Sequence, residues 1–139
     1  MVPFSLYTNP TLYLIFLTGY YKINFIGRFN QFDAPKIYKL ADAYITMTYK
    51  DNCPTAVLEA MSCGRPVITT DVPGCRDAVI KNKTAILVPV KDEVELAKAI
   101  KKLFEDEQLR DKMGSSNREL AIKKFDLKLI LPKIIKLYN

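Results

Sequence analysis

The stretch that decides the fold is TYKDNCPTAVLEAMSCGRPVITT, residues 48–70. Its pattern predicts a strand ending near Thr48, a turn, and an apolar helix that stops at Gly64, so that the N-terminus of the helix faces whatever binds there. Two carboxylates, Asp51 in the turn and Glu59 on the helix, are separated by seven residues. This arrangement suits a phosphate-bearing ligand that also carries hydroxyl groups.

The composition of the whole chain is that of a soluble globular protein of one domain. The chain has 139 residues, of which 49% are hydrophobic and 26% charged. It contains no histidine, so this chain supplies neither a catalytic triad nor a histidine general base. The net charge of +6 is compatible with anionic ligands, nucleic acid or an acidic membrane face, and by itself does not choose among them.

The three cysteines, Cys53, Cys63 and Cys75, form no C-x-x-C pair and have no histidine to join them. We expect them to be small apolar fillers in a reducing compartment, because neither a metal site nor a disulfide framework fits this spacing.

The first 22 residues differ from the rest, and we predict a divergent segment over 1–22 followed by one domain over 23–139. An apolar run from Leu12 to Leu17 is too short to span a bilayer and lacks the flanks of a signal peptide. A buried strand is the better interpretation of this run.

From residue 23 onward, short β-branched runs alternate with helical patterns, which indicates parallel strands joined by crossover helices. The predicted fold class is therefore α/β, with a doubly wound, Rossmann-like parallel sheet and flanking helices. The expected strands are 23–27, 43–47, 66–70 and 85–89, and the expected helices between them are 34–41 and 54–63.

The C-terminal third is predicted to be a helical tail. Amphipathic periodicity indicates helices over 92–104, 108–124 and 126–138. The last is expected to be interrupted or kinked at Pro132, and the lysines of the tail are expected to be solvated.

The start of the central helix carries the candidate chemistry. Amide groups near Thr55 and Ala56 lack partners within the helix, and the helix dipole favours negative charge there, so they can hold a phosphate. Pro54 has no amide to offer but pre-sets the first turn. Glu59 has a Cα–Cβ bond tilted back toward this end, which places it to accept hydrogen bonds from vicinal ribose hydroxyls.

A purely structural interpretation remains open. In it, Asp51 and Asn52 cap the helix and Glu59 is a surface residue paired with a neighbouring lysine.

A long ordered set of segments runs through residues 23–88: Asn24 to Gly27, Tyr38 with Leu40 to Ala43, Pro54, Leu58 to Met61, Gly64 to Val79, and Leu87 to Pro89. In these segments the chain resembles the C-terminal half of retaining glycosyltransferases of family 4, which have the GT-B fold of two Rossmann-like domains facing across a cleft. A weaker similarity continues through Met113-Gly114 and Arg118 to Phe125.

The resemblance implies roles for the two carboxylates. Asp51 and Glu59 occupy the positions of the family's paired glutamates, of which the first contacts the donor sugar and the second holds the ribose of a nucleotide diphosphate. It also implies retaining hexosyl transfer from a nucleotide sugar, usually without a bound metal and with no cofactor besides the donor substrate. The residues expected around the donor are Asn52, Cys53, Thr55 and Ala56 at the sugar and phosphates, and Arg28 and Phe29 near the base.

The chain also departs from the family pattern. Asp51 is shorter than the glutamate expected there by one methylene, roughly 1.5 Å, and Asn52 replaces the usual glycine. No counterpart is found for the basic pyrophosphate clamp or for the acceptor domain. We therefore expect an incomplete C-terminal half of a GT-B fold that is inactive alone. The isolated chain is expected to be marginally stable, to self-associate, or to be completed by a partner chain carrying the acceptor domain.

Three classes of function follow from these features. The chain is a cytoplasmic donor-binding half of a split glycosyltransferase, a non-catalytic remnant or nucleotide-binding module, or a basic binder of nucleic acid or membrane surfaces through its tail. No groove-reading motif supports nucleic-acid binding, and any membrane contact is expected to be peripheral, at the inner face. The first class is the favoured one.

Overall fold

The structure is a computed structural model that describes residues 27, 29, 30 and 32–138. The strand predicted at 12–17, the boundary at residue 22 and Arg28 lie outside the described residues. The strand predicted at 23–27 does so too, apart from Gly27.

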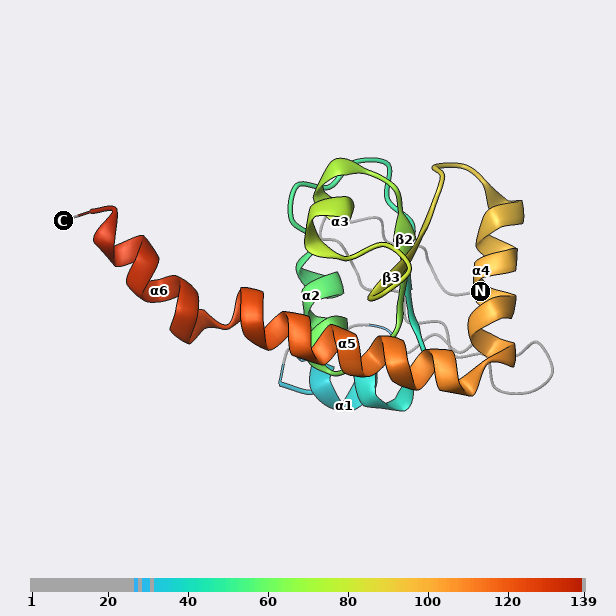
Figure 1. Cartoon of the computed structure of the whole chain (residues 1–139), viewed down its shortest axis with the longest axis horizontal. Coiled ribbons are helices and arrows are strands. Elements are labelled where there is room, and N and C mark those ends of the chain that lie inside the picture. Colours follow the sequence, from blue (N-terminus) through green and yellow to red (C-terminus); the bar gives the residue numbers. More distant parts are fainter. Residues whose placement is uncertain (1–26, 28, 31, 139) are drawn as a thin grey trace.

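A parallel sheet forms the centre of the described chain. Its strands are β1 (Tyr44–Thr46), β2 (Val67–Thr70) and β3 (Ala85–Val88), in the order β1-β2-β3. The register pairs Ile45 with Ile68, and Ile68 with Ile86. Helices α2 (Thr55–Ser62) and α3 (Pro73–Ala78) provide the crossover connections (Figure 1). The predicted α/β class with parallel strands is confirmed.

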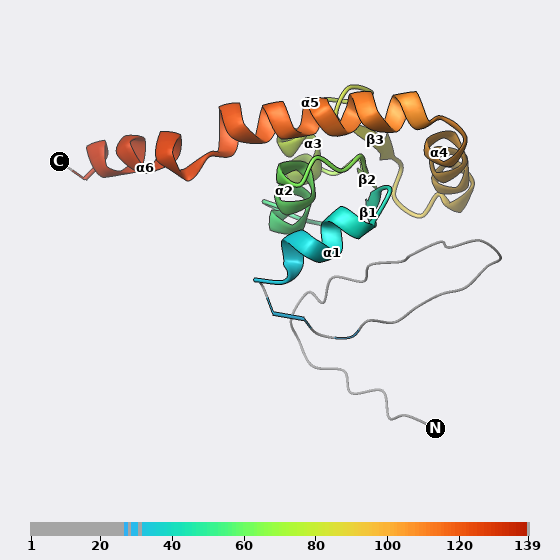
Figure 2. The ribbon, with the colours of Figure 1, turned by 90° about the horizontal axis from the view of Figure 1, so that it is seen from below.

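Helices cover both faces of this sheet, as Figure 2 shows. On one face α2 buries Val57, Ala60 and Met61 completely, in a cluster that includes Val67 of β2. On the other face α4 (Glu93–Glu105) packs with Ile68 of β2 in a second cluster. Successive β2 residues thus point into opposite cores, as strand geometry requires, and this explains why β2 is buried along its whole length.

The remaining helices are α1 (Ala34–Leu40), α5 (Glu107–Phe125) and α6 (Leu127–Lys136). An aspartate caps the N-terminus of each of the last three helices of the chain. The Asp92 side chain accepts a hydrogen bond from the Glu95 amide at the start of α4, at 2.9 Å. Asp106 does the same at the start of α5, with the Leu109 amide at 2.8 Å. The six-residue helix α3 was not predicted from the sequence.

Helix α5 lies directly against the connections that lead into β2 and β3. Gly64 ends α2 with φ of +70°, and a Cβ on Gly114 of α5 would lie only 2.3 Å from the Gly64 carbonyl oxygen. The fully buried Asn117 donates from Nδ2 to the carbonyl oxygens of Arg65 and Thr84, both at 2.7 Å. The backbone contact and the side-chain amide therefore hold α5 to both connections.

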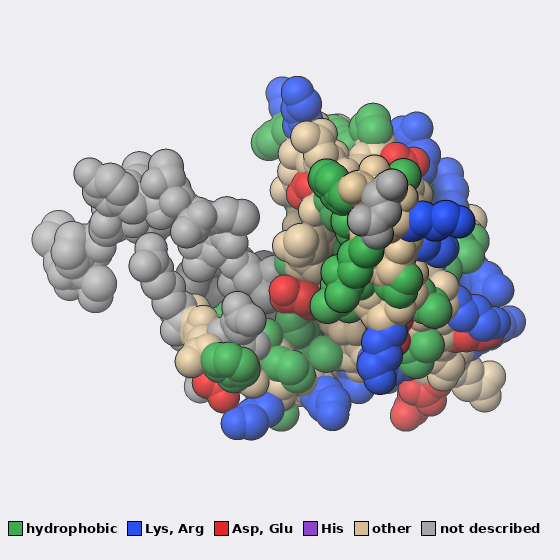
Figure 3. All heavy atoms as spheres, turned by 90° about the vertical axis from the view of Figure 1, so that its left-hand side faces the viewer, with side chains coloured by type: hydrophobic (Ala, Val, Ile, Leu, Met, Phe, Trp, Pro, Cys, Tyr) green, Lys and Arg blue, Asp and Glu red, His purple; other side chains and the backbone are tan. Residues whose placement is uncertain are grey.

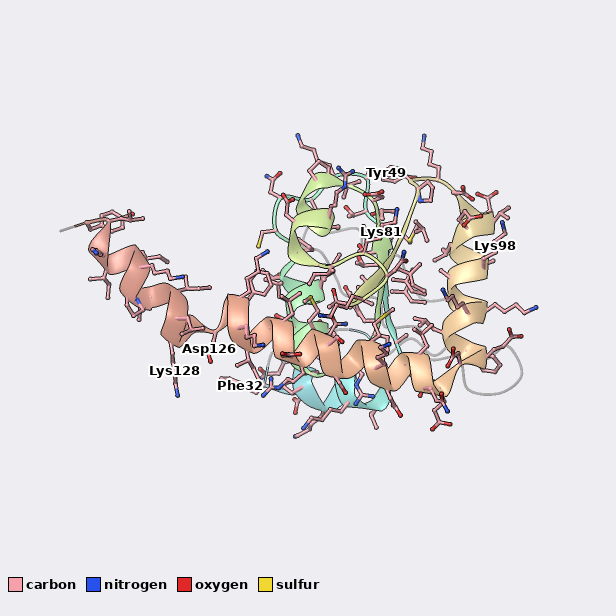
Figure 4. All side chains as sticks on the ribbon, viewed as in Figure 1. Phe32, Tyr49, Lys81, Lys98, Asp126 and Lys128 are labelled. Carbon is pink, nitrogen blue, oxygen red and sulfur yellow. The ribbon has the colours of Figure 1, made fainter. Side chains whose placement is uncertain are left out.

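Helix α6 projects away from the rest of the molecule, as Figures 1 and 2 show, and none of its residues is buried. It continues through Pro132 as one helix. Asp126 and Lys128, labelled in Figure 4, lie at its junction with α5. Viewed from the α6 side, hydrophobic side chains gather centrally with basic side chains along one flank (Figure 3). Among the described residues no helix is long and apolar enough to cross a membrane.

We predict that Gly114→Ala destabilises the fold. A glycine-to-alanine change inside a helix ordinarily stabilises by about 1 kcal/mol. Here the added methyl group meets backbone at 2.3 Å, so α5 must move, and we expect a loss of about 1–3 kcal/mol. Urea unfolding of the variant measures this. Ser115→Ala, on the exposed side of the same helix, is the control and should change stability by less than about 0.5 kcal/mol.

We predict that Asn117→Ala lowers the free energy of unfolding by about 2 kcal/mol or more, because two carbonyl groups lose their donor in a buried environment. Asn117→Asp keeps the shape but replaces the amide donor with an acceptor, and should lower the free energy of unfolding more than alanine does at neutral pH. Equal stability of the aspartate variant and the wild type would show that the amide donors do not stabilise the fold.

Candidate functional site

The N-terminus of α2 lies at the edge of the sheet where the parallel strands end. Pro54 is its N-cap residue, and no side chain caps the helix. The first backbone bond runs from the Val57 amide to the Pro54 carbonyl, at 2.9 Å. The amides of Thr55 and Ala56 have no partner among the described residues, so this end can accept an anion. Tyr49, which follows β1, is labelled in Figure 4.

Asp51 belongs to a tight turn and does not cap α2. Its Oδ1 accepts a hydrogen bond from the Cys53 amide at 3.0 Å, the pattern of an Asx turn. Asp51 is half-buried, whereas Asn52 and Cys53 are exposed. The structural interpretation, in which Asp51 and Asn52 cap the helix, therefore does not match the observed bonds.

The turn at Asp51 rests against the start of α3. A Cβ on Gly74 would lie 2.2 Å from the Asp51 carbonyl oxygen and 2.7 Å from the Asn52 carbonyl carbon. Only glycine allows this approach of two backbones. The loops after β1 and β2 thus meet where ligands bind in open α/β sheets, outside the carboxyl ends of the strands.

Glu59 is exposed, but one of its oxygens is held by a buried tyrosine. Tyr38 of α1 donates from its hydroxyl to Oε2 of Glu59 at 2.9 Å, and Tyr38 itself is 1% exposed. The partner of Glu59 is therefore a phenol and not a lysine. Burial, reinforced by the hydrogen bond with Glu59, raises the pKa of Tyr38 far above its usual value, so the hydroxyl remains a donor at any working pH.

A second buried tyrosine lies beside Tyr38. Tyr44 of β1 packs edge-on against Tyr38, with ring centroids 5.7 Å apart. Burial raises the pKa of Tyr44 to about 12, and the negative charges of Glu59 and Asp51 contribute in the same direction.

The other candidate residues have different surroundings. Phe29 is partly buried and packs against the same apolar cluster as Tyr38, whereas Arg28 lies outside the described residues. Cys53 is exposed, so the prediction that it is an apolar filler is wrong, because the turn points it outward. Cys75 is buried as expected, and burial raises its pKa.

Two surface hollows of the described chain are lined by neither Asp51 nor Glu59. The larger, of about 870 Å³, runs between α5 and residues 63–66. Its arginines Arg65, Arg110 and Arg118 already donate to backbone carbonyls. The smaller, of about 190 Å³, is lined by Tyr49, Thr70 and the start of α4, and so lies at the same edge of the sheet, where the strands end. The described residues include no group of three or more His, Cys, Asp or Glu side chains that could hold a metal.

Sequence reasoning missed two residues that shape this surface, Tyr38 and Gly74. Tyr38 carries its bond across 21 residues of sequence, so spacing within one element gives no sign of it. The Pro73-Gly74 pair was a usable signal for a close backbone approach.

Comparison with known proteins adds independent evidence. The sequence model of the family described as "Glycosyl transferases group 1" matches residues 19–120. The chain is 28% identical over 107 residues to the Campylobacter jejuni enzyme named N,N'-diacetylbacillosaminyl-diphospho-undecaprenol alpha-1,3-N-acetylgalactosaminyltransferase. That match covers 77% of this chain and 28% of the relative.

Two of the solved structures that share the fold illustrate the similarity. Sucrose-phosphate synthase from Thermosynechococcus elongatus superimposes with a TM-score of 0.80 at 30% identity, over 83% of this chain and 29% of that one. Anabaena HepE, solved in complex with UDP, superimposes with a TM-score of 0.71 at 25% identity, over 76% of this chain and 29% of that one.

The chain spans less than a third of the length of these relatives. Because the family match covers most of its residues, and the parallel sheet with its flanking helices agrees with GT-B neighbours, this chain belongs to the glycosyl transferases group 1 family.

Proposed function

We propose that this chain is the donor-binding part of a nucleotide-sugar-dependent, retaining glycosyltransferase that transfers a hexosyl group to a glycan or a lipid-linked acceptor. The observation that carries the proposal is the open N-terminus of α2, with Asp51 before it and Glu59 one turn inside it. Family membership supports it, and so do the names of the relatives, which include an undecaprenol-linked glycan transferase and a UDP complex.

The amides of Thr55 and Ala56 would bind the diphosphate. Their positive partial charge needs no reorganisation when an anion arrives, and Asn52 and Cys53 of the adjoining exposed turn would flank the phosphates and the sugar. Glu59 keeps Oε1 available for the two ribose hydroxyls, since Oε2 is bound to Tyr38. Phe29, with Arg28, would lie near the base.

Asp51 would orient the donor sugar. Its backbone carbonyl packs against Gly74 of α3, and its Oδ1 accepts a hydrogen bond from the Cys53 amide. The carboxylate therefore has a defined position, and Oδ2 is left for the sugar hydroxyls. Acceptor binding, and with it transfer, would require a further domain or a partner chain. The donor is the required small molecule, and no resident metal or other cofactor enters the proposal.

A second candidate is a nucleotide-binding module without transferase activity. The Asx turn favours it, because Asp51 is shorter than the glutamate of the family pattern and already uses one oxygen in the turn. A misplacement of about 1 Å at a reacting group can cost about a hundredfold in rate. Nucleotide binding without sugar transfer, in the presence of the acceptor domain, would distinguish this candidate.

We predict that Glu59→Ala weakens binding of UDP about tenfold or more, because a charged acceptor for the ribose hydroxyls is lost. UDP is the probe because a structural neighbour was solved with it. Isothermal titration calorimetry measures the dissociation constant. Glu105→Ala, an exposed carboxylate on α4 that pairs only with Lys101 among the described residues, is the matched control. Unchanged UDP binding by the Glu59 variant would refute the assigned pocket.

We predict that Thr55→Pro lowers the affinity for UDP but not for uridine. Proline is tolerated at the first position of a helix and removes the N–H group, so the diphosphate loses one donor. Thr55→Ala keeps the amide and removes only the hydroxyl, and should bind UDP within about twofold of wild type, a difference below 0.5 kcal/mol. A proline variant that binds UDP as tightly as the alanine variant would show that this amide does not contact the phosphates.

A further inference from the structure

The hydrogen bond between Tyr38 and Glu59 joins a fully buried side chain to an exposed one. The Tyr38 ring is 1% exposed, yet its hydroxyl reaches Oε2 of Glu59 at 2.9 Å. A buried tyrosine needs a partner for its hydroxyl. Here the partner is a carboxylate with three rotatable bonds on the helix surface, which would otherwise sample several rotamers.

The tyrosine itself has little freedom. Its ring packs edge-on against Tyr44, at 5.7 Å and an interplanar angle of 68°, within the main apolar cluster beneath α2. The donor is therefore fixed in space before any ligand arrives. A carboxylate offers about four acceptor sites, so a bond at Oε2 leaves Oε1 with its full capacity.

We propose that Tyr38 is a positioning residue for ribose recognition: it fixes the Glu59 carboxylate so that Oε1 accepts hydrogen bonds from the vicinal hydroxyls of the nucleotide. This inference rests on the proposed function, in which Glu59 binds the ribose. It adds a residue that touches no ligand and acts only through Glu59. Holding the acceptor in its bound orientation reduces the entropy lost when the nucleotide binds.

The position of Tyr38 also connects two parts of the proposed site. Tyr38 lies on α1, the helix that follows Gly27 to Asn30, and Phe29 packs into the same cluster. Phe29, proposed to lie near the base, and Tyr38, which holds the carboxylate proposed to bind the ribose, therefore pack in one apolar cluster.

The test compares Tyr38→Phe with the wild-type chain in the binding of UDP and of 2′,3′-dideoxy-UDP, which lacks the ribose hydroxyls. We expect wild type to bind UDP more tightly than the dideoxy nucleotide, and the ratio of the two dissociation constants to fall about five- to tenfold in the variant. The dissociation constant of the variant for the dideoxy nucleotide should stay within about twofold of the wild-type value. A purely structural tyrosine would instead weaken both nucleotides equally, and that result, or an unchanged preference, would overturn the inference.

Tyr44→Phe is the matched control, since it removes a second buried phenol from the same cluster, one that makes no hydrogen bond with Glu59 among the described residues, and it should retain the preference for UDP. Glu59→Gln separates the two hypotheses. If the glutamine variant loses the preference and Tyr38→Phe keeps it, only the positioning role is wrong. If the glutamine variant keeps the preference, or wild type binds neither nucleotide, the proposed function fails and this inference fails with it.

The double variant Tyr38→Phe/Glu59→Gln provides a second measurement. If Tyr38 acts through Glu59, its substitution has no further effect on UDP binding once Glu59 has been replaced. Additive losses in the double variant would contradict the proposal.

Discussion

The close contact of α5 with the connection between α2 and β2 determines how the central helix is placed. Gly114 approaches the Gly64 carbonyl, and the amide of Asn117 binds Arg65. Arg118 also donates to the Ser62 carbonyl near the C-terminal end of α2. Carbonyl groups that would otherwise be unsatisfied at a helix end thus find protein partners here. The carbonyl groups at this end of α2 are therefore satisfied within the protein, in contrast to the amides at the other end.

The N-terminal end of α2 contrasts with this in every respect that matters for binding. Its cap residue is a proline, and the amides of Thr55 and Ala56 have no partner in the part of the chain that the structure describes. The surrounding groups are nevertheless fixed, because Gly74 supports the Asp51 turn and Tyr38 supports Glu59. An end that is open to solvent but rigid is what a preorganised anion site requires.

The elements that repeat a local pattern were predictable from sequence, and those that depend on distant contacts were not. The helix ending at Gly64 and the strand over Val67–Thr70 follow from residues within 48–70 alone. The bond from Tyr38 to Glu59 and the contact of Gly114 with Gly64 join residues that only the tertiary fold brings together. Cys53 was misjudged for the same reason, since an apolar residue in a turn is exposed or buried according to what packs over it.

The two acids of the candidate site are held differently, so the proposed nucleotide binding and the proposed sugar transfer depend on different contacts. Glu59 is oriented by a donor outside its own helix, which leaves one oxygen entirely available. Asp51 is shorter than the glutamate of the family pattern and uses an oxygen to close its own turn. In the proposed site, affinity for the nucleotide would depend on α2 and Glu59, whereas orientation of the sugar would depend on Asp51. Sequence change at Asp51 can therefore alter transfer while the nucleotide surface persists, so binding measured on this chain is evidence for the pocket and not for catalysis.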